Sequence, residues 1–79
     1  MAIRIEKEEN NWRVTGEGPT GERVNMWWAE LDQAAYSALE FRSMLGVGPP
    51  QLGDGVPSDA LERGLKLKQV YDHYRETNR

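Results

Sequence analysis

Few residues in this chain have the types and spacing that catalysis requires. The single histidine, His73, lies next to Asp72 in a charged stretch, and the serines Ser37, Ser43 and Ser58 have no nucleophile-elbow context. A Ser-His-Asp arrangement is therefore not indicated. The 79 residues include no cysteine, which excludes a thiol nucleophile, a thiolate zinc site and disulfide bonds. We expect a solvated His73 and a protein that is not an enzyme.

The carboxylates and glycines give no metal or phosphate motif either. Asp54 supplies one loop carboxylate, where a calcium loop needs several at fixed spacing. Gly16, Gly18 and Gly21 match the letters G-x-G-x-x-G, but they precede a predicted strand and not a helix. The helix N-terminus that would hold a phosphate is missing, so we expect no metal and no cofactor.

The composition is that of a small acidic domain. Seventy-nine residues suffice for one core, so residues 1–79 are predicted to form a single domain. Ten Lys and Arg residues against thirteen Asp and Glu give a net charge of −3, which argues against general nucleic-acid binding. No apolar run approaches a membrane span, and the lack of cysteine suits a reducing compartment. We therefore expect a cytoplasmic protein without membrane contact.

Alternating apolar and polar residues predict strands in the first third of the chain. Apolar residues alternate with charged ones from Ile3, and the alternation resumes at Trp12. The run Glu8-Glu9-Asn10-Asn11 separates the two stretches, and asparagine tolerates the positive φ that tight hairpins need. We predict a hairpin with strands over residues 2–8 and 11–16.

A third predicted strand places two adjacent tryptophans on opposite faces of the sheet. Val24, Met26 and Trp28 would face the core, whereas Trp27 would point away from it. The sequence leaves open whether the last helix covers Trp27 or leaves it in solvent. An exposed tryptophan is a typical hot-spot residue in protein interfaces.

Helical spacing predicts a first helix from about residue 29 or 30 to Leu45, ended by Gly46. Tyr36, Leu39 and Met44 lie outside its apolar stripe, so we expect this helix to contact two partners. The stripe itself consists of Leu31, Ala34, Ala35, Ala38, Phe41 and Leu45.

A loop and a second helix complete the chain. Residues 46–57 hold four glycines and three prolines, which predicts a long loop without regular structure. Ser58 or Asp59 would cap the last helix, which continues to about residue 74 or 76. Small residues at Ala60 and Gly64 would allow another element to approach closely. The order of elements predicts an α+β fold of two layers, with one or both helices on a three-stranded antiparallel sheet in the order 1-2-3.

In size, charge and outline, the chain resembles the small phage-encoded inhibitors of bacterial defence, among them anti-CRISPR proteins. The resemblance implies a non-enzymatic inhibitor in the host cytoplasm that binds a larger protein or nucleoprotein complex. An acidic face would then meet cations that normally hold nucleic acid, or Trp27 and the loop would cap the partner sterically. The candidate partner-binding residues are Trp27, Glu6, Glu8, Glu9, Glu17, Glu22, Tyr36 and Arg42.

Two other functions stay open. An assembly module would use the apolar excess of residues 36–44 and the free sheet edge in a homodimer or a virion contact, so the chain is either a monomer or a homodimer. A weak nucleic-acid binder would use the cations of the last helix together with Tyr71 and Tyr74. The acidic composition makes this last function the least favoured.

Overall fold

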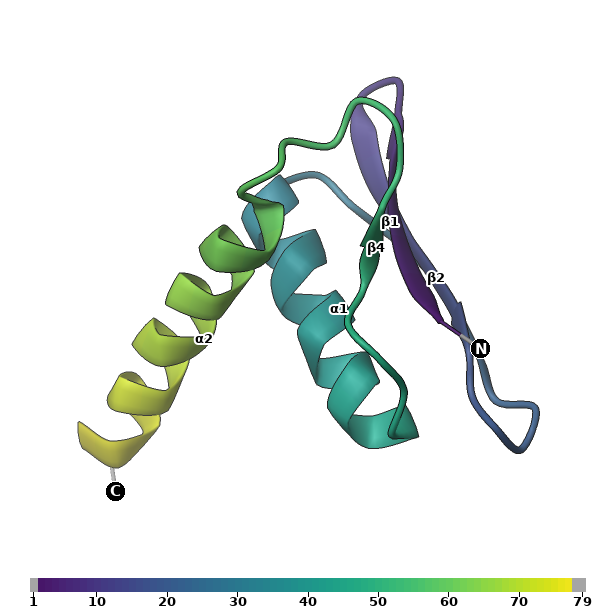
Figure 1. Ribbon diagram of the computed structural model, residues 1–79. Helices are drawn as coiled ribbons and strands as arrows, with labels where there is room; N and C mark the ends of the chain where they lie inside the picture. Colours follow the sequence, from purple (N-terminus) through teal and green to yellow (C-terminus); the bar gives the residue numbers. More distant parts are fainter. Residues whose placement is uncertain (1, 78–79) are drawn as a thin grey trace.

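The computed structural model describes residues 2–77 as an α+β fold with a sheet and two helices (Figure 1). This confirms the predicted fold class. Along the chain the elements are β1 (Ile3–Glu8), β2 (Asn11–Glu17), β3 (Arg23–Trp28), α1 (Leu31–Leu45), β4 (Gln51–Leu52) and α2 (Ala60–Thr77).

The three predicted strands form the antiparallel part of the sheet by successive hairpins. β1 pairs with β2 and β2 pairs with β3, so that Ile5, Val14 and Met26 lie side by side on the face toward α1. The first turn differs in one detail from the prediction. Glu9, and not an asparagine, takes the positive φ of 34°.

A fourth strand makes the sheet mixed, so the prediction of three antiparallel strands is incomplete. Gln51 and Leu52 pair in parallel with Arg4 and Ile5, which gives the strand order β3-β2-β1-β4. The loop over residues 46–57 therefore contains a short regular element. Pro50 precedes β4 and is buried, and its fixed φ suits the extended chain that β1 can pair with.

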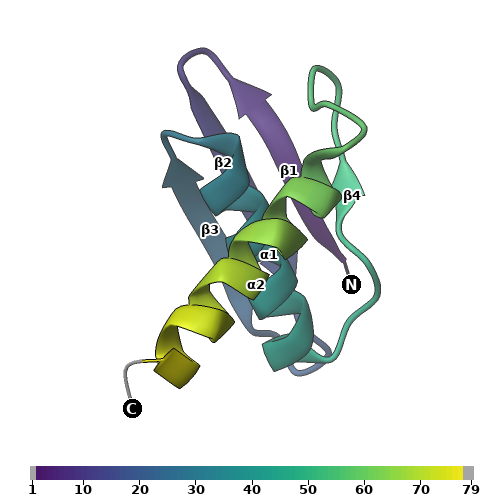
Figure 2. The same ribbon diagram turned by 90° about the vertical axis from the view of Figure 1, so that its left-hand side faces the viewer.

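The elements stack in three layers and not in the predicted two. α1 covers one face of the sheet, and α2 packs on the side of α1 that faces away from the sheet. Figure 2, seen from the helix side, shows α2 in front of α1 and the sheet behind both. The expected two partners of α1 are thus the sheet and α2.

Small side chains allow both contacts of α1. A Cβ atom added to Gly64 would lie 2.7 Å from the carbonyl carbon and the Cβ of Ala35, so α2 approaches the backbone of α1 directly. The C-terminal end of α1 is the glycine cap that the sequence predicts. Gly46 has a φ of 67°, and its N–H donates to the Arg42 carbonyl. The buried core between sheet and helices consists of Ile3, Ile5, Val14, Leu31, Ala34, Ala35, Ala38 and Ala60.

Candidate functional site

The face of the sheet opposite α1 is open within residues 2–77, because both helices lie on the other side (Figure 1). Trp27 points from β3 onto this open face and is 50% exposed. The sequence left the position of Trp27 undecided. In the structure Trp27 is exposed, because α2 packs on α1 and not on the face that carries Trp27.

Side chains from three strands hold the Trp27 indole in place. Its Nε1 donates a hydrogen bond to Glu8 Oε2 at 3.0 Å. The Arg13 guanidinium lies 5.1 Å from the ring centre and pairs with Glu8 at 3.2 Å. Arg13 also donates from Nε to Asn25 Oδ1 at 2.9 Å. The bond from Trp27, followed by the interactions with Arg13, lowers the pKa of Glu8 below its usual value.

A hollow of about 360 Å³ lies beside the indole. It is lined by Trp27, Asn11 and the carboxylates of Glu8 and Glu9. An aromatic wall next to two carboxylates suits a cationic side chain, because the ring face and the acids both attract positive charge. Sequence reasoning missed Arg13 and Asn25 as parts of this site. The strand register could have found them, since Arg13 is the cross-strand neighbour of Trp27.

The predicted acidic residues do not form one acidic face. Glu6, Glu8 and Glu9 lie at the end of the sheet where β1 turns into β2, whereas Glu17 and Glu22 lie at the opposite end. Along β2, Glu17 lies six positions from the residue opposite Glu8, or roughly 20 Å, and four positions from the residue opposite Glu6, or roughly 13 Å. Glu22 instead accepts hydrogen bonds from the hydroxyl and N–H of Thr20, which lower its pKa.

Charges on the open face are balanced. Alternation along the strands places three arginines and three glutamates there, so the strand residues of this face have no net charge. Glu6 pairs with Arg4 at 3.2 Å, in addition to the pair of Glu8 and Arg13. The charged residues on this face are Arg4, Arg13, Arg23, Glu6, Glu8 and Glu17. The open face is therefore a mixed polar surface around one tryptophan.

The remaining two candidate residues lie on the helical side of the molecule, away from Trp27. Tyr36 packs against Tyr71 of α2 with ring centres 5.0 Å apart in an edge-to-face arrangement. Arg75 also donates to the Tyr36 hydroxyl at 3.3 Å. Tyr36 thus belongs to the contact between the helices.

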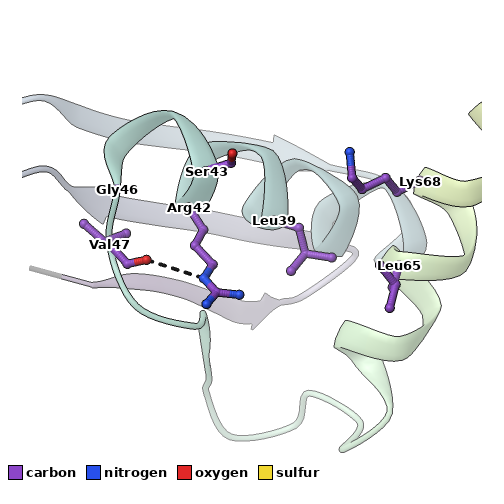
Figure 3. A pocket seen from close by; sticks show the side chains of 7 residues that line it. All are labelled: Leu39, Arg42, Ser43, Gly46, Val47, Leu65 and Lys68. Atoms are coloured by element: carbon purple, nitrogen blue, oxygen red, sulfur yellow. Dashed lines mark hydrogen bonds between the residues drawn. The ribbon is translucent and has the colours of Figure 1, made fainter. Parts of the chain in front are cut away.

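Arg42 lines a groove of about 520 Å³ where the end of α1, the following loop and α2 meet (Figure 3). Its Nε donates to the Val47 carbonyl at 3.4 Å. Lys68 is a second cation of the groove, but it pairs with Glu40 at 3.1 Å and Asp72 at 3.7 Å, which raise its pKa. The other lining residues are Leu39, Ser43, Gly46, Val47 and Leu65. The groove can accept an apolar side chain. The sequence could not predict this groove, because its lining residues come from three separate segments of the chain.

The cations of α2 are largely engaged in ion pairs. Arg63 contacts Asp32 at 2.7 Å, and Arg75 contacts Asp72 at 3.9 Å, in addition to the pairs of Lys68. Paired cations release few counterions from a nucleic acid. This arrangement gives little support to the nucleic-acid-binding alternative.

Within residues 2–77, no group of three or more acidic, histidine or cysteine residues is arranged to hold a metal ion, and His73 is exposed. In the same part of the chain no helix has the length and apolar character to cross a membrane. Comparisons with protein-family models, with curated proteins and with solved structures find no match for this chain.

Proposed function

We propose that this chain is a non-enzymatic protein-binding domain that occupies a surface of a larger partner through the open face of its sheet. Trp27 is the proposed centre of that contact. The observation that carries the proposal is a half-exposed indole on a face that neither α1 nor α2 covers, held by a hydrogen bond to Glu8.

The local geometry favours tight contact. Tryptophan is among the residues that contribute most to interfaces, especially when polar neighbours surround it and exclude water. Glu8 and Arg13 fix the ring before a partner arrives, so less side-chain entropy is lost on binding. The hollow next to Trp27 adds room for a lysine or arginine of the partner beside Glu8 and Glu9.

The biological form that we propose is inhibition of a nucleic-acid-handling bacterial complex, as the resemblance to phage-encoded inhibitors implies. Steric occupation is favoured over mimicry of a nucleic acid, because the charges on the open face cancel. Joint capping by Trp27 and the loop is not favoured. β3 carries Trp27 at one edge of the sheet, and the loop strand β4 forms the opposite edge.

An affinity capture from bacterial lysate tests this function with matched variants. Trp27→Ala should weaken capture of the partner by roughly 30-fold or more, as expected for a hot-spot residue. Met44→Ala is the control, since Met44 is 74% exposed on α1, away from the open face. Circular dichroism would verify that both variants fold. Equal capture by folded Trp27→Ala and Met44→Ala would refute the proposed site.

A further inference from the structure

The two edges of the sheet are built differently. β4 has only two residues and follows Pro49 and Pro50. Short edge strands and prolines are two features by which natural sheets prevent further strands from adding. At the other edge, β3 has six residues and contains neither proline nor lysine. Its only charged residue is Arg23 at the beginning of the strand. The β3 edge thus keeps a row of backbone groups available for pairing.

We infer that β3 pairs antiparallel with β3 of a second copy of this chain, around a two-fold axis at Asn25. In this register Asn25 stands opposite itself, Arg23 stands opposite Trp27, and Val24 stands opposite Met26. This inference goes beyond the proposed function and does not rest on it.

Side-chain alternation restricts the registers to those in which opposing residues share a face. Arg23, Asn25 and Trp27 lie on the open face, whereas Val24 and Met26 lie on the face toward α1. The register centred on Asn25 satisfies this condition. Met26 is 39% exposed at the sheet edge, and Val24 of the second copy would cover it.

A cation–π contact selects this register over the neighbouring one centred on Met26. Among residues 2–77, the Arg23 side chain makes no ion pair or hydrogen bond. Opposite Trp27 of the second copy, its guanidinium gains the face of an indole, a favourable cation–π contact. The register centred on Met26 would instead place Trp27 opposite Asn25, and Arg23 would stay outside the pairing.

The second copy would complete the surroundings of Trp27. Arg13 lies beside the indole on β2, and Arg23 of the second copy would lie beside it on the opposite side. The two Trp27 residues would stand four positions apart along the strands, or roughly 13 Å. Both open faces would then form one continuous surface with two tryptophans.

Disulfide trapping tests the register directly, because the chain has no cysteine of its own. Directly opposed residues in antiparallel strands have the Cα separation that a disulfide requires. Asn25→Cys should therefore form a covalent dimer under mild oxidation, seen on a non-reducing gel. Met26→Cys tests the neighbouring register, and the exposed Met44→Cys reports random collision. Cross-linking that is strongest at Met26→Cys, or no stronger at Asn25→Cys than at Met44→Cys, would overturn the inference.

Sedimentation equilibrium of the unmodified chain provides an independent measurement. We expect a concentration-dependent dimer, and Met26→Lys should weaken it by about tenfold or more, because a charged side chain would replace the apolar contact of Met26 with Val24 of the second copy. Met44→Lys should leave the dimer unchanged. A monomer at all concentrations, or a dimer that folded Met26→Lys does not weaken, would contradict the pairing. The capture experiment with Trp27→Ala reads partner binding, so the two proposals can fail separately.

Discussion

The indole Nε1 of Trp27 and the carboxylate of Glu8 form a hydrogen bond of 3.0 Å that joins β3 to β1 over the strand between them. Arg13 of that middle strand pairs with the same carboxylate and lies against the same ring. The open face is therefore organised around one ionised glutamate. Its protonation should loosen the tryptophan.

Acidification should change the fluorescence of Trp27 through Glu8. The pKa of Glu8 is lowered in the fold, first by the bond from Trp27. A lowered pKa means that the bond contributes its full stability above the unfolded value of about 4.5 and loses it as pH falls through the folded value. We expect a fluorescence transition below pH 4.5 that is absent in Glu8→Gln, measured as the difference between the two proteins. An unchanged transition in Glu8→Gln would assign it to another group.

Gly64→Ala should destabilise the fold although alanine favours helices. The added Cβ would lie 2.7 Å from backbone and side-chain atoms of Ala35, so the helices would have to separate. The gain in helix propensity is about 1 kcal/mol, whereas overpacking costs about 1–3 kcal/mol. We expect a net loss of roughly 1 kcal/mol in urea denaturation. Gly48→Ala is the control, because among residues 2–77, apart from its chain neighbours, no atom lies within 4 Å of its added Cβ. Equal stability of both variants would mean that α2 does not pack this closely.

Trp28→Phe should cost less stability than Trp12→Phe. The Nε1 of Trp28 is buried and has no hydrogen-bond partner within residues 2–77, and a phenyl ring removes that unpaired donor. Removal of this unpaired donor offsets part of the stability lost with the larger ring. We therefore expect the free energy of unfolding to fall by less than about 1 kcal/mol. Trp12 offers no such relief, and its ring lies 4.3 Å from the Lys7 ammonium, a contact that phenylalanine weakens. Thermal denaturation of the two variants compares them directly. A larger loss for Trp28→Phe would show that its N–H is satisfied in solution.

Strand alternation was enough to predict the three antiparallel strands and the opposite directions of Trp27 and Trp28. Period-two patterns report faces directly, because each side chain of a strand points away from its neighbours. β4 could not be predicted in this way. Its two residues have no pattern of their own, and they become a strand only because β1 lies next to them.

The position of α2 could not be predicted from the sequence for a similar reason. Ala60 and Gly64 indicated close packing against some element, but their partner depends on the path of the loop between the helices. That path also creates the groove at Arg42. The surroundings of Trp27 were more accessible, since the hairpin register alone places Arg13 beside it.

Glu9→Asn should stabilise the fold and weaken partner capture at the same time. Glu9 has a φ of 34°, in the left-handed region where asparagine is better tolerated than glutamate. We expect a gain of about 0.5–1 kcal/mol in urea denaturation. Glu9 also lines the hollow beside Trp27, so the loss of its carboxylate should reduce attraction for a cationic side chain of the partner.

Glu17→Asn removes the same charge at the opposite end of the sheet, from a strand position without positive φ. This control should show neither the gain in stability nor the loss in capture. If both variants behave alike in denaturation, the hairpin is not strained at Glu9; if they behave alike in capture, the hollow is not where the partner's charge binds.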